Sequence, residues 1–268
     1  MNTANPLVIA VDSSTTASKA IIVDTEGQVL ALGKREIVLR TPKQGYGEHD
    51  PAMWWKSTNE AIGEAVSQLS DDDRSRIVAI GLTHQRETFA PFTADGTPLR
   101  NGILWLDIRA GDQIKRYGSD AIWQLSGKPA DVTPAIYKMA WVKENEPGTL
   151  EKADKVVDVH AYLVFNLLGE WKDSVACADS LGLFNIAEQT WDDGLLEIAG
   201  LRRDQLPELA KPGEVLGTVL PQVAKEWGLS QEITLVAGLG DGQAAGIGAA
   251  AVPVSYTHLR AHETPEHL

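Results

Sequence analysis

The chain has 268 residues, 43% of them hydrophobic, and a formal net charge of −13. This length and composition are typical of a globular protein with a sizeable core, and no run of about 18 apolar residues is present that could span a membrane. The negative charge repels nucleic acids and anionic lipid surfaces, so we expect neither as a partner.

The first residues and the cysteine content indicate a reducing compartment. The opening stretch MNTANPLVIAVD lacks the basic start and long apolar run of a secretory signal. Cys177 is the single cysteine, so the chain cannot form an internal disulfide. We therefore expect a cytoplasmic protein.

The first part of the chain predicts a mixed sheet. Short β-branched segments predict strands at 7–12, 19–24 and 28–39. Asp50 as N-cap and Pro51 as the first helical residue predict a helix that runs to about Leu69. The polar run 70–75 is expected to be a solvated loop, and the apolar segment 76–83 has the pattern of a buried parallel strand. The resulting order is β-β-β-α-β.

The second part of the chain predicts more helices and one more strand. Apolar residues at helical spacing predict helices over 133–145, 160–169 and 191–200. A strand-like piece leading into a helix is predicted over 103–117. The segment 233–240 is again an apolar strand, and a helix of small residues is predicted to follow it.

The last residues differ in composition from the rest of the chain. Residues 253–268 carry three of the six histidines. His258 and His262 are four positions apart, but no sulfur ligand accompanies them, which disfavours a metal site. We expect residues 1–252 to form the domain and 253–268 to be a non-native tail.

Two nucleotide-binding motifs are absent or weak. The P-loop pattern GxxxxGK[ST] does not occur. Gly240, Gly242 and Ala245 spell GxGxxA after a strand, which is a weak dinucleotide signal. A dinucleotide site requires this motif in the first turn of a βαβ unit, with an acidic residue about 20 positions later, and the expected non-native tail begins before such a unit could be completed. In addition, the negative charge of Asp241 within the turn would oppose a pyrophosphate.

Polar residues follow three of the predicted strands. Asp12 ends the first strand, Gln85, Arg86 and Glu87 follow the strand 76–83, and Asp241 follows the last strand. If these strands are parallel neighbours, their carboxyl ends form one cleft. Taken singly, such acids are more typical of turns and caps. Together with the hydroxyl-rich turn after Asp12 they suit phosphoryl transfer, with one carboxylate for Mg²⁺ and Asp241 as the general base.

Six segments occur in a specific order: VDSSTTASKAIIVD, GYGEHDPAMWW, IVAIGLTHQRET, GILWLDIRA, DSLGLFNIAEQTWDD and VAGLGDGQAAGIG. In order and spacing, residues 7 to about 252 resemble the amino-terminal half of the FGGY carbohydrate kinases, the family of glycerol kinase, xylulokinase, gluconokinase and ribulokinase. The resemblance implies an α/β domain of the ribonuclease-H-like, actin and hexokinase type, with a mixed five-stranded sheet and helices on both faces. It also implies a second such domain, missing here, that closes over ATP and sugar.

The resemblance implies a nucleotide site around the first turn. Ser14, Thr15 and Thr16 match the first phosphate loop, which approaches the β- and γ-phosphates of ATP. Lys19 keeps a cation beside these phosphates. Asp12 is expected to act on Mg²⁺.

The resemblance also implies a catalytic base and a sugar site. Asp241 matches the family's catalytic base. Residues matched with substrate binding are Gln85, Arg86, Glu87, Trp105 and Asp107. Arg109 completes a W-x-D-x-R pattern with Trp105 and Asp107, as in xylulokinases.

Several positions depart from the family's patterns. Thr133 stands where glycerol kinases carry a substrate-contacting Tyr, and Gly242 replaces the usual Gln or Asn after the catalytic Asp. Gln-Arg-Glu replaces the Gln-Met-His of xylulokinases. Glu87 beside Arg86 disfavours a carboxylate substrate such as gluconate.

We therefore expect an enzyme that uses ATP and Mg²⁺ to phosphorylate a hydroxyl of a ketose such as xylulose, or of a related polyol. Glycerol is an alternative substrate. An actin-like ATPase and a catalytically inactive sugar-binding scaffold are the alternatives of other classes. The resemblance allows a homodimer of the full-length protein. Because half of the nucleotide site is missing, we expect weak or no activity from this chain alone.

Overall fold

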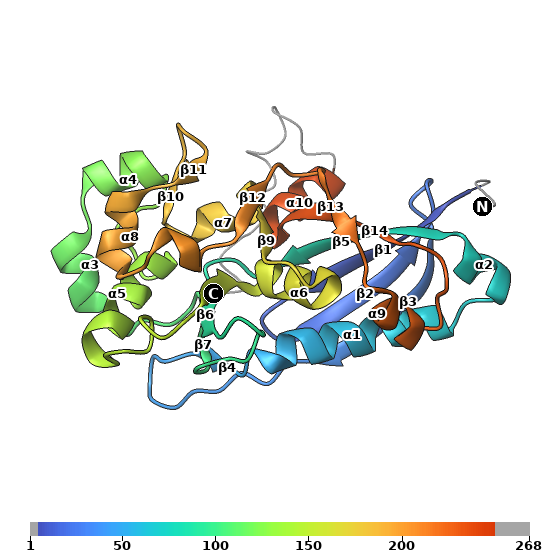
Figure 1. Ribbon diagram of the computed structural model, residues 1–268, viewed down its shortest axis with the longest axis horizontal. Coiled ribbons are helices and arrows are strands. Elements are labelled where there is room, and N and C mark those ends of the chain that lie inside the picture. Colours follow the sequence, from blue (N-terminus) through green and yellow to red (C-terminus); the bar gives the residue numbers. More distant parts are fainter. Residues whose placement is uncertain (1–4, 250–268) are drawn as a thin grey trace.

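The computed structural model of the chain describes residues 5–249, so the expected tail at 253–268 lies outside the described residues. A large sheet with its helices occupies one end of the elongated molecule, and a mainly helical part occupies the other (Figure 1). Within the described range, no helix has both the length and the apolar character needed to cross a bilayer.

Six strands form the main sheet, in the order β13-β14-β5-β1-β2-β3. Their bounds are Leu7–Ser13 (β1), Ala17–Val23 (β2), Val29–Glu36 (β3), Ile77–His84 (β5), Val215–Thr218 (β13) and Thr234–Gly240 (β14). β1, β2 and β3 pair antiparallel, whereas β1, β5 and β14 are parallel neighbours. The predicted mixed sheet of the ribonuclease-H-like type is therefore confirmed.

The number of strands differs from the predicted five. The additional strand, β13, lies at the edge of the sheet and pairs antiparallel with β14. It is short, contains Gly217, and leaves Val215 67% exposed. It therefore shows neither the alternation nor the apolar run by which a strand is recognised in a sequence.

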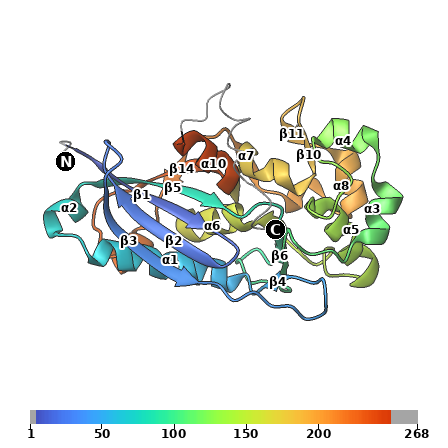
Figure 2. The same ribbon diagram turned by 180° about the vertical axis from the view of Figure 1, so that it is seen from behind.

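Three helices cover one face of the main sheet (Figures 1 and 2). They are α1 (Ala52–Ser67), α6 (Val159–Leu168) and α9 (Pro221–Glu226). Their apolar side chains share a core with the inward residues of the strands. Gly33 of β3 allows α1 to approach closely, because a Cβ at this position would lie 2.0 Å from the carbonyl oxygen of Ala61.

The opposite face of the sheet is covered at one end by α10 (Asp241–Gly248). Ala244 and Ile247 of α10 line a pocket with Ala10 of β1 and Gly81 of β5. These strand residues alternate with the buried ones that face α1, so they point to the other side of the sheet. Helices therefore lie on both faces, as predicted.

Two predictions at the ends of α1 were wrong in detail. The helix begins at Ala52, with Pro51 as the N-cap, although an oxygen of Asp50 accepts a hydrogen bond from the Ala52 N–H. The expected loop after α1 contains a short helix, α2 (Asp71–Ser75). Ser70 caps it, and acidic residues in its first turn interact favourably with the helix dipole.

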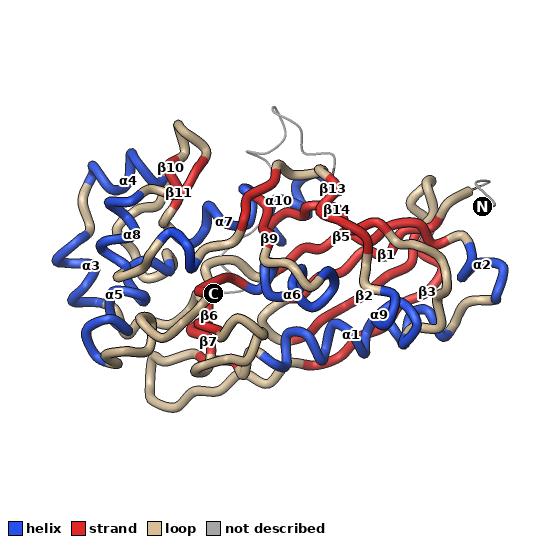
Figure 3. Tube along the Cα trace, viewed as in Figure 1, coloured by secondary structure: helices blue, strands red, loops and turns tan. Residues whose placement is uncertain are grey.

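A small sheet connects the main sheet to the helical part. It has the order β4-β7-β6-β8, with bounds Glu48–His49 (β4), Phe89–Phe92 (β6), Gly102–Ile103 (β7) and Lys155–Asp158 (β8). The helices beyond it are α3 (Gly111–Tyr117), α4 (Asp120–Ser126), α5 (Ala135–Asn145) and α8 (Asp193–Ala199). α5 and α8 lie side by side in this part of the molecule (Figure 3). Their apolar side chains belong to a second hydrophobic cluster.

Short elements complete the chain between these parts. They are β9 (Lys172–Ser174), α7 (Val175–Ala178), η1 (Asp179–Leu181), β10 (Phe184–Asn185), β11 (Thr190–Trp191), η2 (Arg203–Gln205) and β12 (Glu208–Ala210). The helices predicted over 133–145, 160–169 and 191–200 are confirmed as α5, α6 and α8. α6 and α8 end at Gly169 and Gly200, whose φ angles of 78° and 76° require the left-handed conformation that glycine adopts at low cost.

Candidate active site

The carboxyl ends of β1, β5 and β14 meet at one place. Asp12 of β1 lies opposite Thr83 of β5, and Thr83 lies opposite Leu239 of β14. Asp241 follows directly as the first residue of α10. Asp12, Thr83, Asp241 and Gly242 line one open pocket. The expected convergence of the strand ends is therefore observed.

Unpaired oxygens in this pocket fit a hard cation. Oδ1 of Asp12 and Oγ1 of Thr83 are buried and have no hydrogen-bond partner among the described residues. Burial raises the pKa of Asp12, the charge of Asp241 raises it further, and Lys19 opposes the shift. Because Mg²⁺ prefers oxygen ligands and would offset the repulsion of two carboxylates, the residues present fit the expected ion.

We expect Asp12→Asn to make the metal-free chain more stable at pH 7. A raised pKa means that the folded state binds the Asp12 proton more tightly than the unfolded state does. Asp12 therefore destabilises the fold once the pH rises above 3.8, the ordinary pKa of this group. Thermal unfolding of both proteins at pH 3 and pH 7 measures the effect, and the difference should disappear at pH 3.

Mg²⁺ provides the second arm of this test. It should raise the unfolding temperature of the unmodified chain and not that of Asp12→Asn. Glu151→Gln, which removes an exposed charge elsewhere, is the matched control and should respond to Mg²⁺ as the unmodified chain does. A stabilisation by Mg²⁺ that is equal in all three proteins would contradict the assignment of Asp12.

The turn between β1 and β2 uses its hydroxyl groups in two ways. Ser18 bonds to Ser13 and to hydroxyls of α1, with oxygen separations of 2.9–3.3 Å, and these side chains are buried. The N–H and the hydroxyl of Ser14 both donate to the carbonyl oxygen of Ala17. Thr16 is exposed and Thr15 is half-buried. The hydroxyls of Ser13 and Ser18 therefore join the turn to α1, and those of Thr15 and Thr16 lie nearer to solvent.

A hydrogen-bond network connects this turn to the loop that carries Trp105. The indole N–H of Trp105 donates to Oγ1 of Thr15 at 3.0 Å, and this hydroxyl donates to Oε1 of Gln85 at 3.3 Å. Thr88 donates to the same Gln85 oxygen and accepts the Trp105 backbone N–H, each at 3.2 Å. Gln85, expected to contact substrate, is thus buried and holds two loops together.

Arg86 lies beside Gly240 of the last strand, and Glu87 follows Arg86 in the chain. Arg86 forms an ion pair with Asp179, whose second oxygen accepts from Lys128 at 3.0 Å. A Cβ at position 240 would lie 2.3 Å from Cδ of Arg86, so Gly240 leaves room for this side chain. Burial raises the pKa of Glu87, and its φ of 56° is in the left-handed region, which is uncommon outside glycine.

Asp107 does not lie where the sequence led us to expect. It is fully buried, and its oxygens accept from the N–H of Gly47 at 2.7 Å and from the Arg109 guanidinium at 2.7 and 2.9 Å. Arg109 also pairs with Glu48 at 2.8 Å and lies over the ring of Tyr46. Because both oxygens of Asp107 have partners, it supports the loop and does not face an open pocket.

Sequence reasoning missed three charged residues near the site: Lys128, Lys138 and Asp179. Lys138 is fully buried, and its ammonium lies 2.7–3.2 Å from the carbonyl oxygens of Leu104, Trp105, Val132 and Thr133. Lys138 lies between Tyr137 and Met139 in the predicted helix, and this position among apolar residues could have indicated that it is buried. Asp179 and Lys128 carried none, because their partners are distant in the sequence.

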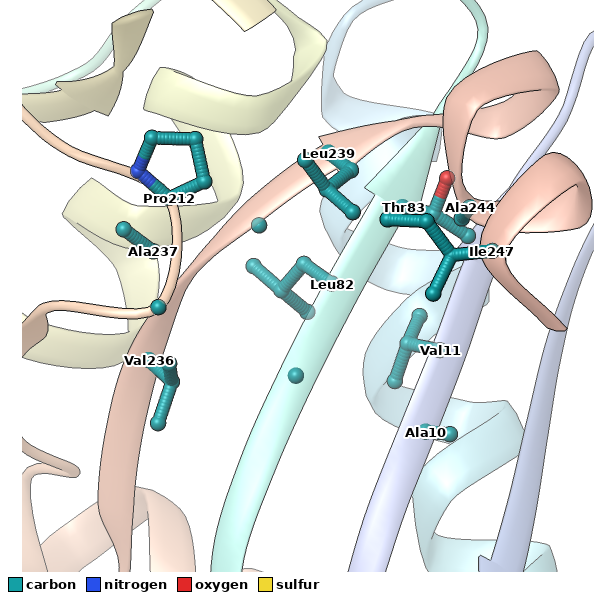
Figure 4. A pocket seen from close by; sticks show the side chains of 13 residues that line it. Ala10, Val11, Leu82, Thr83, Pro212, Val236, Ala237, Leu239, Ala244 and Ile247 are labelled. Atoms are coloured by element: carbon teal, nitrogen blue, oxygen red, sulfur yellow. The ribbon is translucent and has the colours of Figure 1, made fainter. Parts of the chain in front are cut away.

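An apolar pocket adjoins the acidic one (Figure 4). It has a volume of about 480 Å³ and lies between β1, β5, β14 and α10. Among the described residues that line it, Thr83 is the one polar side chain, and it lies at the end near Ala244 that both pockets share. The polar chemistry is therefore concentrated at the strand ends and not on the sheet face.

The chain is similar to known kinases. The family model for the N-terminal domain of the FGGY family of carbohydrate kinases matches residues 7–248. Glycerol kinase from Thermococcus onnurineus is 35% identical over 251 residues, which cover 91% of this chain and 50% of that protein. Xylulose kinase from Escherichia coli is 29% identical, with 94% and 52% covered. The crystal structure of gluconate kinase from Lactobacillus acidophilus superposes with a TM-score of 0.86 at 26% identity, covering 92% of this chain and 50% of that one.

The fold and the likeness together define one domain of a two-domain kinase fold. The chain belongs to the FGGY family of carbohydrate kinases. It spans about half the length of the relatives that it matches.

Proposed function

We propose that this chain carries the sugar-side half of an enzyme that transfers the γ-phosphoryl group of ATP to a hydroxyl of a sugar or polyol. The observation that carries the proposal is the shared pocket of Asp12 and Asp241 at the ends of adjacent parallel strands. The hydroxyl-bearing turn begins directly after Asp12, and Arg86 packs against Gly240 beside it. Donors for phosphates, a metal ligand and a base are thus close together.

Each group has a role in this proposal. Asp241, exposed at the start of α10, accepts the proton of the attacking hydroxyl. Arg86, Glu87 and Trp105 hold the polyol, with Trp105 offering an apolar ring that is 40% exposed. The backbone N–H groups of Thr15 and Thr16, the exposed hydroxyl of Thr16 and the exposed Lys19 bind phosphate oxygens.

The expected metal ion has its ligands at the same place. Asp12 and Thr83 would hold Mg²⁺, which supplies charge neutralisation of the phosphates when it is bound. Gln85 and Asp107 act in this scheme by fixing the loops that carry the binding residues. A cytoplasmic location remains part of the proposal.

A neutral substrate fits the charges around Arg86. Asp179 pairs with both Arg86 and Lys128, and Glu87 adds a second acid nearby. Because Arg86 and Lys128 are already paired with Asp179, a carboxylate substrate is disfavoured. We therefore favour a ketose or polyol, and glycerol is supported as an alternative by the relatives named glycerol kinase.

Sugar-dependent consumption of ATP tests the proposal. The full-length protein is assayed with ATP, Mg²⁺ and a panel of ketoses, polyols including glycerol, and aldonates. If the protein is a kinase, one of these sugars will be required for ADP formation, and one molecule of ADP will form for each molecule of sugar that is phosphorylated. Hydrolysis of ATP that ignores every sugar would instead favour an actin-like ATPase, and sugar binding without turnover would favour an inactive scaffold.

The chain as it stands is expected to have little or no kinase activity. It spans about half the length of its relatives, and the resemblance places much of the nucleotide site in the second domain. The same ATP assay, run on this chain beside the full-length protein at equal concentration, measures the difference. Equal turnover would show that this half contains a sufficient nucleotide site.

A further inference from the structure

A bulge interrupts β14 shortly before Asp241. Val236 pairs with Gly81, whereas Leu239 pairs with Thr83, so β14 contains one more residue than β5 over this interval. At Gly238 a Cβ would lie 1.9 Å from the carbonyl oxygen of Leu82, so only glycine fits there. Bulges bend a strand and change the direction of the residues that follow, which here lead directly into α10.

His160 of α6 accepts the backbone N–H at the bulge. The Gly238 N–H donates to Nε2 of His160 at 3.2 Å, and both groups are buried. On the other side of the ring, Nδ1 lies 2.8 Å from Oδ1 of Asp173, which is also fully buried. Because Nε2 must accept, the ring hydrogen lies on Nδ1 and Asp173 accepts it.

Neighbouring groups fix the orientation of the His160–Asp173 pair. Oδ1 of Asp173 also accepts the Ser174 N–H at 2.7 Å, which orients the carboxylate. Burial lowers the pKa of His160 to about 4, so the ring is neutral at physiological pH and keeps a lone pair for Gly238. Asp173 and Gly238 are thus joined through one imidazole ring.

A metal site is the competing explanation for this cluster. Ligand atoms of His160, Asp173 and Cys177 lie within 4.8 Å of one another. However, both ring nitrogens of His160 already have partners in Gly238 and Asp173. A metal would have to displace one of these buried hydrogen bonds, so the arrangement favours a structural clamp.

We propose that His160 and Asp173 are positioning residues that hold the β14 bulge and thereby fix the direction in which Asp241 leaves the sheet. The catalytic consequence rests on the proposed function, in which Asp241 is the base. A general base must lie within hydrogen-bond reach of the proton that it takes, and a displacement of about 1 Å can lower turnover by about 100-fold. The structural part of the proposal does not depend on catalysis.

Two amide variants that differ in reach test the clamp. His160→Asn can bond to Asp173 but is too short to reach Gly238, whereas His160→Gln extends to the position of Nε2. The unmodified chain and both variants are isotope-labelled for NMR. Hydrogen exchange of the Gly238 amide and the chemical shifts of the Asp241 and Gly242 amides are then measured in each. We expect exchange to rise by about tenfold or more in the Asn variant and to stay nearer to the original rate in the Gln variant.

The control and the contradicting results are specific. His49→Asn changes another fully buried histidine, in β4, whose ring accepts the Trp54 indole N–H, and it should leave Gly238 exchange close to that of the unmodified chain. Equal exchange in the unmodified chain and the Asn variant would overturn the clamp. Unchanged shifts of Asp241 and Gly242 would overturn its effect on the base.

Kinetics of the full-length protein separate this inference from the proposed function. We expect the Asn variant to lower kcat by about tenfold or more with little change in KM for the sugar, and the Gln variant to recover part of it. An unmodified enzyme that turns over sugar, with an Asn variant of equal kcat, would overturn the positioning role. An unmodified protein without sugar-dependent turnover would refute the proposed function, while the exchange and shift measurements would still decide the clamp.

Discussion

Replacing Asp241 by Asn in the full-length protein is expected to lower kcat by about 10²–10⁴-fold, the range that general-base catalysis typically contributes. Asn keeps the size of the side chain but cannot accept the proton of a substrate hydroxyl. Because Arg86, Glu87 and Trp105 hold the sugar in this proposal and are left unchanged, the KM for the sugar should change little. Steady-state kinetics with the preferred sugar measure both parameters.

Asp193→Asn is a suitable control for this prediction. Asp193 is also the first residue of a short helix, α8, and it pairs with Arg203 away from the site. It should leave kcat close to that of the unmodified protein. If Asp241→Asn were equally active, Asp241 would not be the base, and the phosphoryl-transfer scheme would need another acceptor for the proton.

Replacing Lys138 by Met is expected to lower the free energy of unfolding by about 3 kcal/mol or more, because several buried carbonyl groups lose their donor. The ammonium joins the loop at Leu104 and Trp105 to the loop at Val132 and Thr133. Chemical denaturation followed by circular dichroism measures the loss. Lys143→Met, in the same helix but exposed and with one hydrogen bond, is the matched control and should lose far less.

The effect of Lys138 should depend on pH. Burial lowers its pKa from 10.5 to about 7, so between these values the unfolded chain binds more protons than the folded one. The contribution of Lys138 to stability therefore rises as the pH increases from 7 towards 10. The stability difference between the unmodified chain and Lys138→Met should widen over this range. A difference that is constant with pH would contradict the lowered pKa.

Much of the main sheet could be predicted because its signals are local. Buried and less buried side chains alternate along β1, and β5 and β14 are runs of mostly apolar residues. Each pattern is contained within one short segment of the sequence, so it can be recognised without knowing the fold. Gly169 and Gly200 likewise marked helix ends through a conformation that the residue itself favours. β13 was missed because a short, exposed edge strand with a glycine has no such pattern.

The candidate site was predictable in part. Asp12 and Asp241 were found because each directly follows a recognisable strand, and the ends of parallel strands lie at the same edge of a sheet. Gln85 and Asp107 were named for substrate but are occupied by protein partners. The residues that neighbour a polar side chain in the sequence do not reveal which group it will contact in the folded protein.

The sequence by itself determined five strands of the main sheet and the acids that follow them, since periodicity and strand termini are properties of neighbouring residues. The tertiary structure alone decided the partners of the buried polar groups. Arg86 meets Asp179 across 93 positions, Gly47 meets Asp107 across 60, and Gly238 meets His160 across 78. A buried charge or N–H must find an acceptor or donor wherever packing brings one, and packing joins segments that are far apart along the chain.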